Sequence, residues 1–291
     1  MKKSLIIIFS LAITISAIAQ ETTTFPEQET SKHEFSINAG GGMSTLLYSP
    51  AKGEQSIGFG YTFGLGYTFN FSENWAIITG LDIASYNSSY KANAPLSISY
   101  WITHPPVTPP PPAGSNATFF VTYRYTDYEE SQSSIFLNIP IMLQYSIPVG
   151  NNKFYVAAGA KIGIPVSATF KIDGGQLNLT GYSYYTGQEY THDHGFGQSS
   201  PSNDGDLDFK LSCMASLETG FCWTLSPQWN LYTGIYFDYG LTDISNTNEN
   251  VMVEYNASGN HAYNSAIQSH PLNVDKINNM ALGLKVRVSF R

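Results

Sequence analysis

The chain has 291 residues, of which 12% are charged, and 14 basic against 22 acidic side chains give it a net charge of −8. Soluble globular domains carry about twice that share of charged residues. The low charge argues against a nucleic-acid-binding protein, which needs a basic surface, against a disordered chain and against an ordinary cytosolic protein. The 20 Tyr, 17 Phe and 25 Gly residues take the place of the usual Leu, Lys and Glu, and this composition favours strands over helices.

The N-terminus has the three parts of a secretory signal. Lys2 and Lys3 are basic, residues 5–16 are mostly apolar, and Ala17-Ile18-Ala19 is a small-x-small cleavage site. No Cys follows that site, so a lipid-anchored lipoprotein is not expected. We predict three parts: a cleaved signal peptide over 1–19, a periplasmic tail over 20–33 and one folded domain over 34–291.

Beyond the signal, large apolar residues alternate with small or polar ones. In residues 57–69 every odd position is large and apolar, and every even position is Gly or Thr. This period of two is typical of strands. It recurs in eight segments: 35–43, 57–71, 75–85, 135–147, 154–170, 207–225, 231–241 and 279–290.

The connections between these segments are alternately short and long. The short ones are 72–74, 148–153 and 226–230, and the long ones are 44–56, 86–134, 171–206 and 242–278. The pattern predicts an all-β fold: a closed up-and-down antiparallel transmembrane β-barrel of eight strands, with short periplasmic turns and long extracellular loops. Residues 119–125 are also strand-like. They either extend the barrel wall, pair with 176–179 or 251–255 as an extracellular rim, or, with a second such segment, make a barrel of ten strands.

Two features indicate that the apolar face of the barrel meets lipid and does not line a cavity. The other face of residues 57–69 is made of Gly and Thr, which are too small and uncharged for a solvated surface but suit a narrow interior. Aromatic residues also gather at strand ends beside the short turns, as they do at a bilayer interface. We expect an interface girdle of Trp75, Tyr145, Phe154, Trp223, Trp229 and Phe290.

Six charged residues have the parity of the inner face and similar distances from the short-turn end of their strands. They are Asp82, Lys161, Glu218, Asp238, Lys285 and Arg287. Charges at membrane depth are costly unless they are paired, so three acids and three bases predict an ion-pair cluster that fills the lumen. A path for protons or small ions and a catalytic acid pair are the alternatives.

Other candidate sites are weaker. His192 and His194, with Asp204, Asp206 and Asp208, have spacings that suit a divalent cation, but a solvated loop is the default and we expect no metal or cofactor. A lipid-modifying enzyme needs a His beside a hydroxyl at the outer rim. The rim offers Ser85, Tyr86 and Thr169 without such a His.

Three local features complete the expectations. Cys213 and Cys222 fall nine positions apart in one predicted strand, too far for a disulfide, so both are expected to be free thiols. Pro165 predicts a bulge near the outer rim. The proline-rich stretch 104–112 predicts an exposed polyproline II loop tip.

Residues 135–145, Ile-Phe-Leu-Asn-Ile-Pro-Ile-Met-Leu-Gln-Tyr, resemble a strand of the PorT-like outer-membrane β-barrel family common in Bacteroidota, which is similar to small OmpA/OmpX-type barrels. The Gly-rich segment 35–42 and the final amphipathic segment fit the same family, although Arg291 follows Phe290 at the end. The resemblance implies a barrel in the Gram-negative outer membrane. It implies no activity.

The expected function is therefore that of a monomeric integral outer-membrane protein, not an enzyme, with a plugged lumen and a structural or surface-interaction role for its loops. A small pore and a lipid-modifying enzyme are the alternatives. The expected partners are outer-membrane lipid, the assembly machinery through the C-terminal strand, and an unknown extracellular ligand or protein.

Overall fold

The structure is a computed structural model that describes residues 32–103, 118–184, 186–246, 251–269, 272, 274 and 276–291. The predicted signal peptide, the tail up to residue 31 and the proline-rich stretch 104–112 lie outside the described residues. In the part described, no helix is long and apolar enough to cross a membrane.

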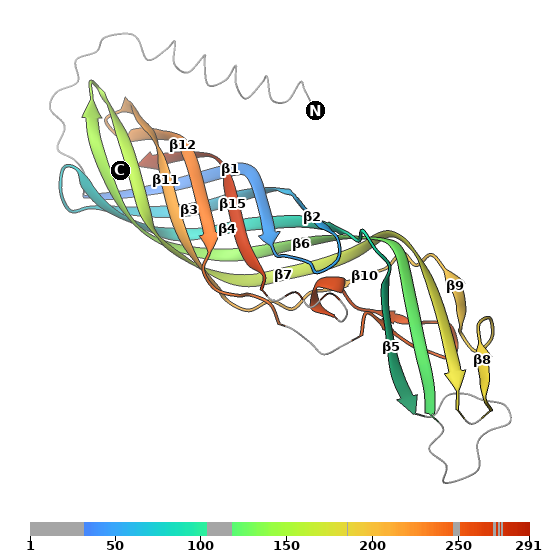
Figure 1. Cartoon of the computed structure of the whole chain (residues 1–291). Helices are drawn as coiled ribbons and strands as arrows, with labels where there is room; N and C mark the ends of the chain where they lie inside the picture. Colours follow the sequence, from blue (N-terminus) through green and yellow to red (C-terminus); the bar gives the residue numbers. More distant parts are fainter. Residues whose placement is uncertain are drawn as a thin grey trace.

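Among the described residues, eight antiparallel strands pair in a closed ring (Figure 1). In ring order they are β1 (His33–Leu47), β3 (Phe59–Asn70), β4 (Trp75–Lys91), β6 (Thr118–Val149), β7 (Asn152–Ser183), β11 (Ser212–Ser226), β12 (Trp229–Gly240) and β15 (Asn278–Phe290). The ring closes where β15 pairs with β1, from Phe35 opposite Phe290 to Leu47 opposite Asn278. The predicted closed antiparallel barrel is confirmed, and each of the eight predicted segments lies on one strand of the ring, apart from short overhangs at strand ends.

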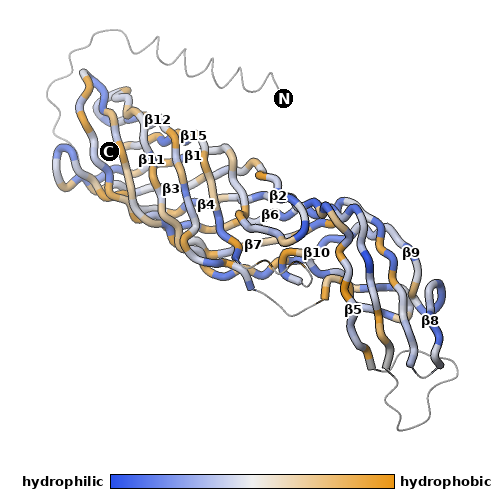
Figure 2. The backbone as a smooth tube through the Cα atoms, in the orientation of Figure 1, coloured by the Kyte–Doolittle hydropathy of each residue, from blue (hydrophilic) through white to orange (hydrophobic). Residues whose placement is uncertain are grey.

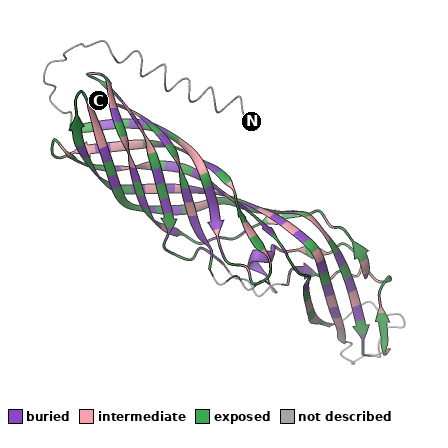
Figure 3. Ribbon diagram, turned by 45° about the horizontal axis from the view of Figure 1, so that its top comes forward, coloured by how far each residue is buried: buried purple, intermediate pink, exposed green. Residues whose placement is uncertain are grey.

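Side chains alternate between the two faces of the ring, which Figure 3 shows as purple and green steps along each strand. On β6 the odd-numbered residues of 135–147 point outward and the even-numbered ones inward. The outward side chains of all eight strands are mainly large and apolar, and Leu284 and Phe59 are 66% and 72% exposed. Water could not cover so many apolar side chains without a large cost, whereas lipid can. We call this surface the apolar band.

The apolar band ends at a common level on three neighbouring strands. On the side of Ile83 on β4, Ile135 on β6 and Val166 on β7 that lies away from the short turns, the outward residues become polar. They form rows across the strands: Asn87, Ser133 and Thr169, then Ser89, Ser131 and Lys171. At this level the register of β6 and β7 shifts between Ile135 and Phe136, opposite 165–167, which confirms the bulge predicted at Pro165.

Above this level β6 and β7 continue into a second sheet that projects from one end of the barrel (Figures 1 and 2). β5 (Leu96–Thr103) pairs with the upper part of β6, and β8 (Gln188–Tyr190) and β9 (Gly197–Ser199) pair with the upper part of β7. We call this sheet the extension. β2 (Glu54–Ile57) and β10 (Asp204–Asp206) pair with β4 and β7 at the mouth of the barrel.

The bend between barrel and extension has a local cause. The register of β6 and β7 shifts between Thr126 and Glu129, where Asp127 has a φ of 52°. Opposite it on β7, Gly175 has a φ of 129°, and a Cβ atom there would lie 2.7 Å from Cε1 of Tyr125. Only glycine fits both the backbone and the space at this position.

The prediction of long loops over 86–134 and 171–206 is wrong for most of their described residues, which are strands. In the extension the alternation is inverted, because water replaces lipid outside: Val121, Tyr123 and Tyr125 are fully buried, and the outward residues are mainly polar apart from aromatic rings at the far end. Residues 119–125 continue β6 beyond the ring, where they pair with 177–183 and with β5. They therefore extend one side of the barrel wall and pair in part with 176–179, as two of the alternatives expected, and among the described residues the pairing with 251–255 does not form.

The last long connection folds over the extension and the mouth of the barrel. β13 (Val253–Glu254) pairs with β14 (Ala262–Tyr263), and the short helix η1 (Ala266–Gln268) follows. Tyr100 on β5 donates to the carbonyl of Val253 at 2.9 Å. Buried residues of this connection, such as Ile267 and Ile277, join one hydrophobic core with residues of the barrel mouth and the extension. We call the described residues of this segment, 265–269, 272, 274, 276 and 277, the cap.

Candidate functional site

The lumen holds the six charged residues singled out in the sequence, and all six are buried. Two direct ion pairs each join two strands that are separated by one strand of the ring. Lys161 Nζ on β7 lies 2.7 Å from Asp238 Oδ2 on β12, and Lys285 Nζ on β15 lies 3.2 Å from Glu218 Oε2 on β11. The remaining carboxylate oxygens accept hydrogen bonds from hydroxyls, Ser216 to Asp238 at 2.6 Å and Tyr155 to Glu218 at 2.9 Å.

Arg287 and Asp82 are held without a direct ion pair among the described residues. The Arg287 guanidinium lies over the ring of Tyr232, 4.1 Å from its centroid, and donates to Gln144 Oε1 at 2.8 Å. Asp82 Oδ1 accepts from the Asn38 amide at 3.0 Å, while Asp82 Oδ2 and Asn38 Oδ1 have no partner among the described residues. A cavity lined by Asp82, Glu218, Lys285 and Arg287 brings four of the six together.

The glycine stripe of β3 makes room for this cluster. A Cβ atom on Gly64 would lie 1.9 Å from Asp82 Oδ1 and 2.5 Å from the carbonyl oxygen of Leu81. The Asp82 carboxylate on the next strand thus occupies the space that a side chain at Gly64 would need.

Apolar and aromatic side chains close the lumen above the ion pairs. Tyr86 donates to Met214 Sδ at 3.4 Å, and its ring meets Phe136 edge-on at a centroid distance of 5.7 Å. Phe136 stacks at 6.4 Å on Phe209, which belongs to the core that the cap completes. Polar side chains thus line the lumen toward the short turns, and buried apolar and aromatic side chains lie between them and the cap.

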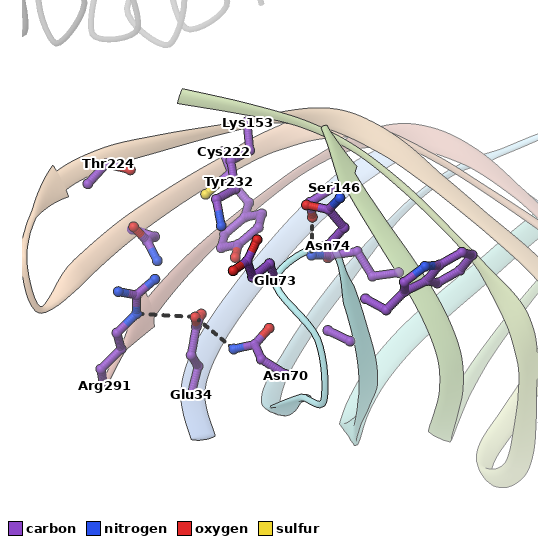
Figure 4. Close-up of a pocket in the computed structure, with 14 residues that line it drawn as sticks. Glu34, Asn70, Glu73, Asn74, Ser146, Lys153, Cys222, Thr224, Tyr232 and Arg291 are labelled. Carbon is purple, nitrogen blue, oxygen red and sulfur yellow. Dashed lines mark hydrogen bonds and ion pairs between the residues drawn. The ribbon is translucent and has the colours of Figure 1, made fainter. Parts of the chain in front are cut away.

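The periplasmic mouth contains an ionic contact that the sequence analysis did not single out. Glu34 on β1 accepts hydrogen bonds from Asn70 at 3.1 Å and Arg291 Nε at 3.2 Å (Figure 4). It also accepts one from Ser289 at 3.0 Å. This contact joins the first and last strands of the ring. In the sequence, the position of Glu34 on the inward face could have indicated this contact. Arg291 lies outside the alternating run, so its part in the contact could not have been predicted.

A second buried carboxylate that the sequence analysis missed lies under the cap. Glu130 on β6 accepts hydrogen bonds from Gln132 at 2.9 Å, from the backbone N–H of Ala266 at 2.8 Å, and from the hydroxyls of Tyr128 and Ser265. No described basic side chain pairs with it, and burial raises the pKa of the Glu130 carboxyl. Ser265 and Ala266 belong to the cap, so Glu130 ties the cap to the barrel wall.

The six residues of the expected girdle all lie near the short turns, with Trp75 and Trp229 clearly exposed. Several contact one another or other aromatic rings: Trp75 and Tyr145 at a centroid distance of 4.7 Å, Trp229 and Phe290 at 5.7 Å, and Phe154 and Phe221 at 5.5 Å. The indole N–H of Trp223 donates to Thr233 at 2.9 Å.

The weaker candidates do not assemble. Among the described residues no group of three or more His, Cys, Asp or Glu side chains could hold a metal ion, so His192 and His194 form no such group with Asp204, Asp206 and Asp208. At the outer rim Tyr86 is buried inside the barrel, while Thr169 faces outward. Cys213 and Cys222 are free thiols, as predicted.

Comparison with known proteins agrees with the barrel. Residues 18–246 match the model of the outer membrane protein beta-barrel domain family. No curated protein matches the chain. Among solved structures, Neisserial surface protein A covers 89% of the chain with 97% of its own length, at 11% identity and a TM-score of 0.32.

Ail, the attachment invasion locus protein of Yersinia pestis, solved with the heparin analogue sucrose octasulfate, covers 89% with 100% of its length, at 13% identity and a TM-score of 0.29. OprG from Pseudomonas aeruginosa covers 89% with 96% of its length, at 10% identity and a TM-score of 0.30. The more specific PorT-like resemblance stays a prediction. With most of its length matched by the family model, the chain belongs to the outer-membrane β-barrel domain family and is a protein of the Gram-negative outer membrane.

Proposed function

We propose that this protein is a closed outer-membrane barrel whose lumen conducts no solute and whose working part is the folded extension at the cell surface. The proposal of a closed lumen is supported mainly by the order in which polar, aromatic and cap residues follow one another along the inside of the ring. The Lys161–Asp238 pair fills the middle. The fully buried Tyr86, Phe136 and Met214 lie beyond it, and the cap covers them. An ion would have to break this core to pass.

The role at the surface is supported by how much of the chain builds the extension. β5, β8, β9 and the upper thirds of β6 and β7 lie beyond the apolar band, together with the β13–β14 hairpin. Ordered packing under this sheet, such as the stacking of Phe196 on Tyr255 at 4.7 Å, would be superfluous in loops that only connect strands. We further propose that the protein acts as a monomer and not as an enzyme, and reaches the membrane through the assembly machinery that reads its C-terminal strand.

Planar-bilayer recordings test the closed lumen. The purified protein should show no steady conductance. The variant Phe136→Ala, which opens the core of apolar and aromatic side chains, should conduct more often than Asp82→Asn, which changes only the polar part below it. Steady conductance of the unmodified protein that changes with Asp82→Asn would instead support the ion path.

Labelling of intact cells tests the surface role. A cysteine at exposed Ser99 on β5 should react with a membrane-impermeant maleimide, while a cysteine at Asn74 in a short turn should react only after the outer membrane is opened. The reverse pattern would contradict the proposal.

A further inference from the structure

The outer face of the extension carries an exposed aromatic cluster at its far end. Trp101 on β5 lies opposite Phe120 on β6, which lies opposite Tyr182 on β7. The centroid of Trp101 is 4.7 Å from that of Phe120 and 5.2 Å from that of Tyr184, and Tyr182 and Tyr184 meet at 4.9 Å. Trp101 and Tyr184 remain 54% and 64% exposed. A folded surface rarely leaves contiguous rings so open without a partner.

The rest of the same face consists of hydroxyl and amide side chains. The next row is Ser99, Thr122 and Thr180, and the row after it is Ser97, Arg124, Asn178 and Gln198. From Trp101 to Ser97 the face extends about 13 Å along the strand. At its lower end lies a hollow of about 500 Å³, lined by Arg124, Thr126, Gln176, Asn178, Gln198 and Ser199 among others.

The residue types on this face indicate which class of ligand it can bind. Its described strand positions contain no aliphatic side chain, although Leu, Ile, Val and Met fill the opposite, buried face. A protein partner with an apolar core would find nothing there to pack against except the rings. The face carries one base, Arg124, without an ion pair among the described residues, and one acid, Glu189 opposite Tyr182. A face so nearly neutral, on a chain with a net charge of −8, does not attract a polyanion.

We propose that this face of the extension binds an uncharged oligosaccharide, an inference that rests on the proposed surface role. A pyranose ring has an apolar face of C–H groups, which stacks on an aromatic ring, and a rim of hydroxyls. Amides both donate and accept hydrogen bonds, as a sugar hydroxyl does. Trp101 and Tyr184 bind one end of the chain by stacking. The amides of Gln176, Asn178 and Gln198 bind hydroxyls further along, and Arg124 donates to ring or hydroxyl oxygens.

Titration with defined sugars tests this inference. The purified full-length protein in lipid nanodiscs is titrated with maltohexaose, cellohexaose, xylohexaose and chitohexaose, by calorimetry and by tryptophan fluorescence. At least one sugar should bind and change the emission of Trp101. Trp101→Ala should weaken that binding about tenfold, the loss expected for one stacked aromatic contact. Trp101→Phe should retain most of it, and Lys171→Gln, an exposed change on the barrel wall, should have no effect.

Two outcomes would overturn the inference. They are no binding of any of the four sugars and binding that Trp101→Ala leaves intact. The proposed function fails separately, if the Ser99 cysteine is not labelled on intact cells or if the lumen conducts. Failure of sugar binding with successful labelling rejects the ligand alone.

Discussion

Removing the Asp238 carboxylate leaves the Lys161 ammonium buried without its counter-charge. The two groups are 2.7 Å apart, and their side chains are 5% and 4% exposed. Deleting one partner of a buried ion pair costs about 3–5 kcal/mol, because the other charge keeps its desolvation penalty and loses the attraction that offset it. Asp238→Asn retains the shape of the side chain and an acceptor for Ser216, so the loss isolates the charge.

The exposed pair of Lys91 and Glu129 is the matched control. Its side chains are 69% and 44% exposed, and a pair in solvent contributes about 0–1 kcal/mol. The free energy of unfolding is measured by urea titration in lipid vesicles, with the folded fraction read from heat-modifiable gel mobility. Asp238→Asn should lose several times more than Glu129→Gln. The double variant Lys161→Met/Asp238→Asn should recover most of the loss. Equal losses for the buried and the exposed variant would refute the reasoning.

Three further predictions follow from other contacts. Gly64→Ala should lower the free energy of unfolding by about 1–3 kcal/mol, because the new Cβ would lie 1.9 Å from Asp82 Oδ1. Gly174→Ala, which has open space around it, should change the free energy little in the same urea titration. Equal effects of the two variants would contradict the close contact at Gly64. The raised pKa of Glu130 means that its carboxyl binds a proton more tightly when the cap is closed than when it is open. Hydrogen-exchange protection of the cap should therefore be greatest below the ordinary carboxyl pKa of 4.5 and fall as the pH rises through the raised pKa of Glu130. Glu130→Gln should remove this pH dependence, and protection that grows with pH would refute the prediction. Glu34→Gln should lower the temperature of the heat-modifiable gel shift, because it weakens charge-assisted hydrogen bonds that join the first and last strands. Each such bond contributes about 1.5–3 kcal/mol. An unchanged temperature would show that closure of the barrel does not depend on them.

The ring could be predicted because lipid imposes the strictest alternation. Along 135–147 the outward side is apolar throughout and the inward side contains Asn138, Gln144 and Ser146, so parity alone indicates both strand and face. The same parity places Lys161 and Asp238 on the inner wall.

The extension could not be predicted in the same way. There the buried face mixes Tyr123 and Tyr125 with aliphatic side chains, while Tyr182 and Tyr184 lie on the exposed side, so tyrosine occurs on both. The contrast between the faces therefore weakens just where the sheet leaves the membrane. The partners of Glu130 were also hidden, since Ala266 is 136 positions away along the chain and contributes a backbone N–H, which no sequence motif reveals.

The central claim is that the apolar band lies in the membrane and that the extension lies in water outside it. Fluorescence quenching by brominated lipids tests this claim directly in variants that retain one of the four tryptophans. Trp75 and Trp229, on the outward face near the short turns, should be quenched strongly in vesicles of brominated lipid, and Trp101, at the far end of the extension, should not be quenched. Quenching of Trp101 as strong as that of Trp229 would contradict the account.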